Sequence, residues 1–285
     1  MKPMRIPFVV LCLALVGCAS TSTGLRRAAI PAGSHYVAMG SSFAAGPGIA
    51  TIEAGSPSRC TRSIENYAHQ LAARRALALT DVTCSGAKTE HILEAWRELP
   101  AQLDALRADT RLVTVTVGGN DLGYMSALVS ASCANLQLQS RFPSMSCRSP
   151  AAPDESSFTA LGLRLEKIAQ EVRRRSPEAT LVFVDYATVM PTRGGCDAMP
   201  LTAHDATTLR LVDRRLRVLT EKVARQNGAQ LLKAGALTRD HHVCAKDPWM
   251  NGFAVDDKGL RTAVYHPTLA GMTAVAEALD RLLPR

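Results

Sequence analysis

Short apolar runs alternate with longer helical patterns along most of this chain, and this alternation restricts the fold more than any other feature. Each run is bounded by turn-forming residues, which is typical of buried strands in a parallel sheet. Strands are expected at 36–39, 81–84, 112–117, 180–184 and 230–232. Helices are expected at 67–78, 89–106, 158–175, 206–226 and 268–283. The alternation predicts an α/β fold, a three-layer α/β/α sandwich around a central, mostly parallel five-stranded sheet.

Two long segments, 49–63 and 130–156, interrupt the alternation and are rich in Ser, Pro and Cys. Long irregular segments in a compact domain are usually functional or disordered. Because both contain cysteine, we expect stapled loops at the rim of a site; decoration without a role in binding is the alternative. Neither a repeat nor a linker divides the rest, so one domain is expected over residues 34–285.

The N-terminus has the pattern of a targeting segment. Lys2 and Arg5 precede an apolar stretch, 6–16, that is too short to span a bilayer, which predicts a signal peptide over residues 1–17. The end of this stretch, Leu15-Val16-Gly17-Cys18, resembles a bacterial lipobox. The resemblance implies acylation of Cys18, a polar tether over 18–33 and a cell-envelope lipoprotein, with the outer membrane favoured because no acidic residue follows the cysteine. Cleavage after Ala19 would instead give a secreted soluble protein.

Six of the eight cysteines lie beyond this segment, and an even number in an exported chain favours three disulfides over metal ligands. Since no CxxC or HxxxH spacing is present, we expect neither a metal nor another cofactor. Six cysteines allow about 15 pairings. Chain order suggests three local loops, which are Cys60–Cys84, Cys133–Cys147 and Cys196–Cys244.

The composition is that of a globular protein, with 47% hydrophobic residues. The net charge is +8, and Lys2 and Arg5 of the signal peptide supply two of these charges. The remaining basic residues are scattered without interleaved aromatic residues, so we expect no nucleic-acid partner.

Four polar or glycine-containing turns follow expected strands or open the last helix, and they contain Ser42, Gly86, Asn120 and His266. The carboxyl ends of parallel strands are where α/β proteins place reactive side chains. A serine hydroxyl needs a base to take its proton, and His266 is the candidate base for Ser42. The plainer alternatives are a serine N-cap and a histidine packed at the start of a helix.

These turns carry a resemblance to the SGNH (GDSL-type) hydrolases. The stretch Gly40-Ser41-Ser42-Phe43-Ala44-Ala45-Gly46 resembles the first family block, with Ser41 in the place of the usual aspartate, and Gly118-Gly119-Asn120-Asp121 resembles the third. The pattern Cys60, Arg62-Ser63 and Asn66-Tyr67 is similar to that of the disulfide-rich secreted bacterial esterases and lipases. The resemblance implies a flavodoxin-like sheet and an activity on esters.

The same resemblance implies an oxyanion hole. Its donors would be the backbone N–H groups of Ser42 and Gly86 and the side-chain amide of Asn120. Glycine leaves its N–H open to close approach, and an asparagine amide can donate where a carboxylate cannot. We interpret the neighbouring Asp121 as a helix-start cap.

The chain departs from the family at the residue that orients the histidine. Most members have an aspartate three residues before it, but this chain has Ala263. We therefore expect a Ser42–His266 dyad whose imidazole is oriented by the backbone carbonyl of Ala263. The rival orienters are Asp256 and Asp257, from the preceding loop.

Carboxylesterase or lipase activity on a small ester or lipid is the function that the sequence favours, in a protein that we expect to be a monomer. Two alternatives stay open. One is a deacetylase of envelope carbohydrate, and the other is a non-catalytic envelope lipoprotein with the same fold. Any contact with a membrane would come from the acylated Cys18.

Overall fold

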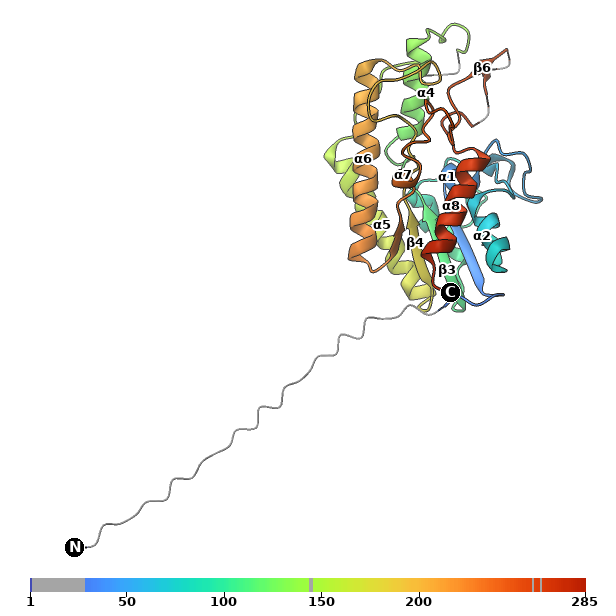
Figure 1. Cartoon of the computed structure of the whole chain (residues 1–285), viewed down its shortest axis with the longest axis vertical. Helices are drawn as coiled ribbons and strands as arrows, with labels where there is room; N and C mark the ends of the chain where they lie inside the picture. The colour runs from blue at the N-terminus through green and yellow to red at the C-terminus, as the bar shows by residue number, and fades with distance from the viewer. Residues whose placement is uncertain (2–28, 144–145, 258, 262) are drawn as a thin grey trace.

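The computed structural model describes Met1 and residues 29–285, apart from 144–145, 258 and 262 (Figure 1). Its sheet has five parallel strands in the order β2-β1-β3-β4-β5, which confirms the predicted fold class. The bounds of the strands are β1 (His35–Gly40), β2 (Ala78–Asp81), β3 (Thr110–Thr116), β4 (Thr180–Val184) and β5 (Gln230–Leu232).

Helices cover both faces of the sheet (Figure 1). One face packs against α5 (Glu155–Arg175) and α6 (Ala203–Gln226), and the other packs against α2 (Tyr67–Arg75) and α8 (Leu269–Leu282). Strand β1 shows why its sequence is apolar throughout. Val37 and Met39 point into the first core, whereas Tyr36 and Ala38 point into the second.

Side-chain caps fix where the long helices begin. Asp154 accepts from the backbone N–H of Ser157 at the start of α5, and Thr202 accepts from Asp205 at the start of α6. These residues satisfy N–H groups that have no partner within the helix. Both helices consequently begin three residues earlier than the apolar periodicity indicates.

The helix expected at 89–106 is wrong. The chain instead forms a short helix, α3 (Thr89–Leu93), a turn closed between Trp96 and Leu99, and a 3₁₀ segment, η2 (Gln102–Ala105). Arg97 in this turn has a φ of 56°, and Pro100 has no N–H to continue a helical ladder. An unexpected helix, α4 (Tyr124–Asn135), occupies the start of the second long segment.

Strand β2 begins three residues earlier than expected, because α2 ends at Arg75 and Ala76 takes the left-handed conformation. The expected residues still run along β1, since the N–H groups of Val82 and Cys84 donate to the carbonyls of Ala38 and Gly40, each at 3.0 Å. The remaining short elements are α1 (Ser42–Ala45), η1 (Ser58–Cys60), α7 (Ala234–Leu237), β6 (Val255–Asp256) and β7 (Gly259–Leu260).

The three expected disulfides are confirmed: Cys60–Cys84, Cys133–Cys147 and Cys196–Cys244. Disulfides are typical of exported proteins and therefore favour export. Apart from Met1, the expected signal peptide lies outside the described residues, and so do Cys18 and most of the tether. Among the described helices, none is long and apolar enough to cross a membrane. Ile30 is already buried against the core that includes α2 and α8.

Candidate active site

Ser42 lies at the turn between β1 and α1, where the carboxyl end of a central strand meets a helix start. The turn depends on Gly40, whose φ is 143°. A Cβ on Gly40 would lie 2.4 Å from the carbonyl oxygen of Thr116, so no other residue fits without moving β3. The turn thus fixes the Ser42 hydroxyl at the edge of the sheet.

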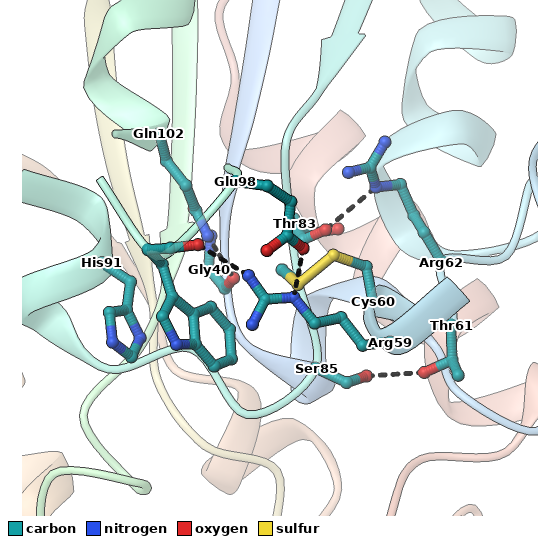
Figure 2. The surroundings of a disulfide bond; sticks show 12 residues. Gly40, Arg59, Cys60, Thr61, Arg62, Thr83, Ser85, His91, Glu98 and Gln102 are labelled. Atoms are coloured by element: carbon teal, nitrogen blue, oxygen red, sulfur yellow. Dashed lines mark hydrogen bonds and ion pairs between the residues drawn. A yellow bond between two sulfur atoms is a disulfide. The ribbon is translucent and has the colours of Figure 1, made fainter. Parts of the chain in front are cut away.

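Gln102 clamps this turn from the side of η2. Its Oε1 accepts from the N–H of Gly40 at 2.7 Å, and its Nε2 donates to the carbonyl of Gly40 at 3.1 Å (Figure 2). Gln102 is buried. Sequence reasoning missed this residue because it placed position 102 inside a continuous helix. A buried amide that satisfies both polar groups of one strand residue holds that residue in a single position.

Ser42 and His266 are in contact, as the sequence predicts. His266 Nε2 lies 2.8 Å from Ser42 Oγ. The backbone around the histidine is held by an adjoining segment, because the N–H of Asn251 donates to the His266 carbonyl and the N–H of Tyr265 donates to the Asn251 carbonyl, each at 2.8 Å. The ring of Phe43 lies against the imidazole, with centroids 5.3 Å apart. Hydroxyl and imidazole are therefore positioned for proton transfer.

The carbonyl that faces the imidazole is that of Val264, so the expectation for Ala263 is wrong. His266 Nδ1 lies 2.8 Å from the Val264 oxygen, whereas the Ala263 oxygen accepts from the backbone N–H of His266 at 3.1 Å. The cause is the backbone, since Ala263 and Tyr265 both have a positive φ, of 62° and 61°. A carbonyl can only accept, so Nδ1 carries the proton and Nε2 presents its lone pair to Ser42.

The rival carboxylates lie elsewhere. Asp257 is exposed and pairs with Arg141, at 3.2 Å. Asp256 is exposed as well, and its carbonyl accepts from Arg141 at 3.1 Å. Within the described part of the chain, no carboxylate contacts the His266 ring. The structure therefore gives no support to either aspartate as orienter.

Replacing Asp256 and Asp257 together by asparagine is expected to leave kcat/KM for a neutral ester within about threefold of wild type. The reason is that exposed ion pairs such as the one with Arg141 contribute little. The measurement is steady-state hydrolysis of p-nitrophenyl butyrate. A thousandfold loss in the folded double variant would show that a carboxylate orients His266 after all.

The environment of His266 favours the neutral imidazole. Burial lowers the pKa of His266 to about 4, and the hydrogen bond with the Val264 carbonyl opposes this effect only in part. A nearby carboxylate would hold the pKa higher by stabilising the imidazolium. A neutral imidazole is the form that can accept the proton of Ser42.

The pH dependence of kcat/KM should report this pKa. Only neutral His266 accepts a proton, so activity is lost as pH falls through the pKa of about 4 and is constant from about pH 5 to 8. The measurement is a pH–rate profile with an uncharged ester, with tryptophan fluorescence at each pH to exclude unfolding. An acid limb centred at the ordinary histidine value of about 6.5 would contradict the lowered pKa.

The expected oxyanion donors surround the same edge of the sheet. Asn120 follows β3, and its Nδ2 donates to the carbonyl of Ala87 at 3.0 Å. This bond ties the amide to the loop that contains Gly86, whose φ is 81°. Within the described residues, the backbone N–H groups of Ser42 and Gly86 have no hydrogen-bond acceptor. These two N–H groups and the second N–H of the Asn120 amide are open to a ligand.

Asp121 and Tyr186 brace the two turns that carry Gly86 and Asn120. Asp121 Oδ2 accepts from the N–H of Thr89 at 3.0 Å, so this residue caps α3. Burial raises the pKa of the Asp121 carboxyl, and hydrogen bonds from Thr89 oppose the shift.

Tyr186 was not anticipated from sequence. Its hydroxyl accepts from Gly119 N–H at 2.8 Å and lies 3.2 Å from Ser41 Oγ. Ser41 thus forms a hydrogen bond with Tyr186 that supports the structure of the turn.

The segment that contains Cys60, Arg62-Ser63 and Asn66-Tyr67 supports the turn that carries Ser42. The N–H of Ser63 donates to the carbonyl of Ala45, at the end of α1, at 2.8 Å. Asn66 caps α2, and its Nδ2 donates to the buried carboxylate of Asp81 at 2.8 Å. Arg62 Nε donates to the Thr83 carbonyl at 2.9 Å, close to the Cys60–Cys84 disulfide (Figure 2). The first long loop is in this way attached to the end of β2 and to α1.

A groove of about 850 Å³ opens beside His266. The start of α4, the second stapled loop and the segment after β7 form its walls. Most of its larger side chains are apolar, and they include Leu122, Met125, Val129, Leu260 and Val264. The second of the two long loops thus lies at the rim of the site, as expected. The groove is suited to an apolar acyl chain or alcohol.

A serine paired with a histidine at the carboxyl end of a parallel sheet defines the class of serine hydrolases with an α/β fold. Residues 38–274 match the GDSL-like Lipase/Acylhydrolase family. The chain belongs to this family, and it is a hydrolase of ester bonds.

Known proteins similar to this chain include several from Streptomyces. A protein named Lipase 2 from Streptomyces coelicolor is 29% identical over 214 residues, 73% of this chain and 72% of that protein. A protein named Lipase from Streptomyces rimosus is 26% identical over 262 residues, which cover 92% and 89% of the two chains. The crystal structure of phospholipase A1 from Streptomyces albidoflavus is similar at a TM-score of 0.71 and 26% identity, covering 88% of this chain and 99% of that one.

Proposed function

We propose that this protein is a carboxylesterase or lipase in which Ser42 is the nucleophile and His266 the general base. The observation that carries the proposal is the 2.8 Å contact between Ser42 Oγ and His266 Nε2, with Nδ1 bound to the Val264 carbonyl. Nucleophile, base and orienter are then arranged in the order that acyl transfer requires. The family, whose members include lipases and acylhydrolases, supports the same reaction.

The reaction proceeds in two halves. Ser42 Oγ attacks the ester carbonyl carbon while His266 Nε2 takes the hydroxyl proton. The oxyanion accepts hydrogen bonds from the N–H groups of Ser42 and Gly86 and from the Asn120 amide. His266 then protonates the leaving alcohol, and an acyl-Ser42 ester remains. Water, deprotonated by His266, attacks this ester; the bond to Ser42 Oγ breaks, His266 returns the proton to Ser42 Oγ, and the acid is released.

The Val264 carbonyl has part of the role that an aspartate would have as the orienter of the histidine. It holds the ring orientation and accepts the hydrogen bond from Nδ1–H throughout, so its partial negative charge stabilises the imidazolium that forms during attack. A carbonyl dipole stabilises that cation less than a carboxylate does. The lowered pKa of His266 is consistent with this difference.

The test of the proposed function is hydrolysis of a p-nitrophenyl ester series from acetate to laurate, combined with labelling by a fluorophosphonate probe. We expect turnover of esters and a single labelled peptide that contains Ser42. An apolar groove of about 850 Å³ favours acyl chains longer than acetate. Absence of both turnover and labelling in the folded protein would leave a non-catalytic envelope lipoprotein. Release of acetate from glycans with little turnover of longer chains would indicate a carbohydrate deacetylase.

We further propose an exported protein with a signal peptide over 1–17, a tether over 18–33 and a hydrolase domain over 34–285. Acylation of Cys18 would anchor it to a membrane as a monomer. The three disulfides support export. Mass spectrometry of the mature N-terminus tests the anchor, since an unacylated N-terminus at another residue would exclude it.

A further inference from the structure

The backbone N–H of Gly86, one of the proposed oxyanion donors, is not held in place by a hydrogen bond of its own. Within the described residues it has no acceptor, which keeps it open to a ligand. Gly86 has a φ of 81° and no side chain, so its backbone is freer than that of any other residue type. The orientation of this donor must therefore be fixed by the groups around it.

The residues before Gly86 are held by the first stapled loop. The N–H of Ser85 donates to the Cys60 carbonyl at 3.2 Å, and Ser85 Oγ lies 2.8 Å from Thr61 Oγ1 (Figure 2). The disulfide joins Cys60 to Cys84. These bonds fix the chain as far as Ser85 and leave the position of the next residue to packing.

Trp96 supplies this packing. A Cβ added to Gly86 would lie 3.4 Å from Trp96 Cη2, so the outer edge of the indole covers the side of Gly86 where other residues have a side chain. Trp96 also packs against the cluster that Ala87 forms with the neighbouring disulfide. The Ala87 carbonyl in turn accepts from Asn120 Nδ2 at 3.0 Å. One ring thus lies against the chain that carries one proposed donor and anchors another.

The ring of Trp96 is itself held between two side chains. The imidazole of His91, on α3, stacks on it with centroids 4.0 Å apart and planes 2° apart. The guanidinium of Arg59 lies 3.9 Å from the ring centroid, and two groups this close cannot share one face of the ring. Arg59 Nη2 also donates to the Trp96 carbonyl at 2.7 Å, and its Nε pairs with Glu98 at 3.2 Å (Figure 2). Stacking and cation–π contacts therefore fix the indole before any ester binds.

We propose that Trp96 is a positioning residue of the oxyanion hole, which holds the Gly86 peptide so that its N–H is oriented for the oxyanion. The inference rests on the proposed ester hydrolysis at Ser42, with Gly86 as a donor. In this role Trp96 acts through Gly86 rather than through contact with the ester. Oxyanion donors are effective because they are in place before charge develops, and a displacement of about 1 Å costs up to about a hundredfold in rate.

The test replaces Trp96 by alanine and by phenylalanine. Alanine removes the ring, whereas phenylalanine keeps a ring that can stack between His91 and Arg59 but is too short to supply the edge that faces Gly86. We expect kcat for p-nitrophenyl butyrate to fall by about tenfold to a hundredfold with alanine and by about threefold or more with phenylalanine. KM should stay within about threefold, because the donor acts in the transition state.

Inhibition by butylboronic acid gives a second readout. Its boron bonds to Ser42 Oγ, and the tetrahedral, negatively charged adduct resembles the intermediate of ester hydrolysis. The inhibition constant should rise in each Trp96 variant by about the factor by which kcat falls. A fraction of unfolded protein would lower the apparent kcat but leave the inhibition constant unchanged, so this constant separates positioning from loss of stability.

Leu99→Ala is the matched control for packing. Leu99 packs against the same cluster as Trp96, and its hydrogen bonds with Trp96, at 2.8 and 3.1 Å, join backbone atoms that the variant keeps. Its melting temperature should fall, as for other truncations of partly buried apolar residues, while kcat and the inhibition constant stay within about threefold. If Trp96→Ala does not fold, the phenylalanine variant decides by the same two constants.

Three outcomes would overturn the role of Trp96: wild-type constants in the folded Trp96 variants, a lower kcat without a higher inhibition constant, or an equal rise of that constant in Leu99→Ala. Each of them leaves the hydrolase intact. If the folded wild type does not hydrolyse p-nitrophenyl butyrate and Ser42 is not labelled by the fluorophosphonate, the proposed function itself is refuted.

Discussion

The Ser42→Ala variant is expected to lose about 10⁴-fold or more of kcat for p-nitrophenyl butyrate. The variant lacks the oxygen that lies 2.8 Å from His266 Nε2, and no covalent acyl-enzyme can form without it. The proposed oxyanion donors and the groove remain, so a small residual rate over that in water is expected. The measurement is a progress curve at saturating ester with protein purified from a host that lacks this enzyme.

Ser41→Ala is the matched control for this result, because it removes a hydroxyl one residue away. Ser41 is buried and lies 3.2 Å from the Tyr186 hydroxyl, which keeps its bond from Gly119 N–H in the variant. We expect its kcat to stay within about tenfold of wild type, with a loss of stability of about 1 kcal/mol. Equal activity losses in the two folded variants would mean that Ser42 is not the nucleophile.

Replacing Asn120 by alanine is expected to lower kcat by about a hundred- to a thousandfold while KM changes little. In the proposed mechanism the amide donates to an oxygen that carries negative charge only in the transition state, so its removal should affect the chemical step rather than ester binding. The bond from Nδ2 to the Ala87 carbonyl, at 3.0 Å, fixes the amide before substrate arrives. Steady-state kinetics with p-nitrophenyl butyrate give the two constants separately.

Asn120→Asp separates the donor role from a role in packing. Aspartate has nearly the same shape, but its ionised carboxylate cannot donate to an oxyanion or to the Ala87 carbonyl. It should therefore reduce kcat at least as much as alanine does. A variant with raised KM and unchanged kcat would assign Asn120 to ground-state binding. Thermal melting of both variants checks that the turn still folds.

The strands were easiest to predict where the sequence signal is local. The bounds of β4 and β5 agree with the expected 180–184 and 230–232, because each is an apolar run directly preceded by a turn. The helix at 89–106 failed because its apolar positions fit a helical period while Pro100 and the turn at Arg97 prevent one. In this segment, the side chain of Gln102 binds Gly40, which lies 62 residues away in the sequence. No local sequence pattern indicates such a contact.

The sequence predicted those parts of the candidate site that depend on particular types of side chain. Ser42, Gly86, Asn120 and His266 follow strand ends or open a helix, and the structure brings Ser42 and His266 into contact. The orienter was not predictable to the residue, because it is a main-chain oxygen. Which carbonyl faces the imidazole depends on the backbone angles of the residues beside it, and alanine and tyrosine give no signal for a positive φ. Tyr186 was missed because its contacts come from distant turns.

The Val264 carbonyl has a consequence for how this enzyme can vary over time. A carboxylate orienter is lost by one nucleotide change, whereas a main-chain oxygen survives every substitution at its own position except those that alter the path of the chain. The path of the chain around residues 263–265 therefore matters more for this contact than the identity of the side chain at position 264. Searches that require an acidic third member will overlook chains of this kind, and single-residue insertions here should be tolerated less than exchanges.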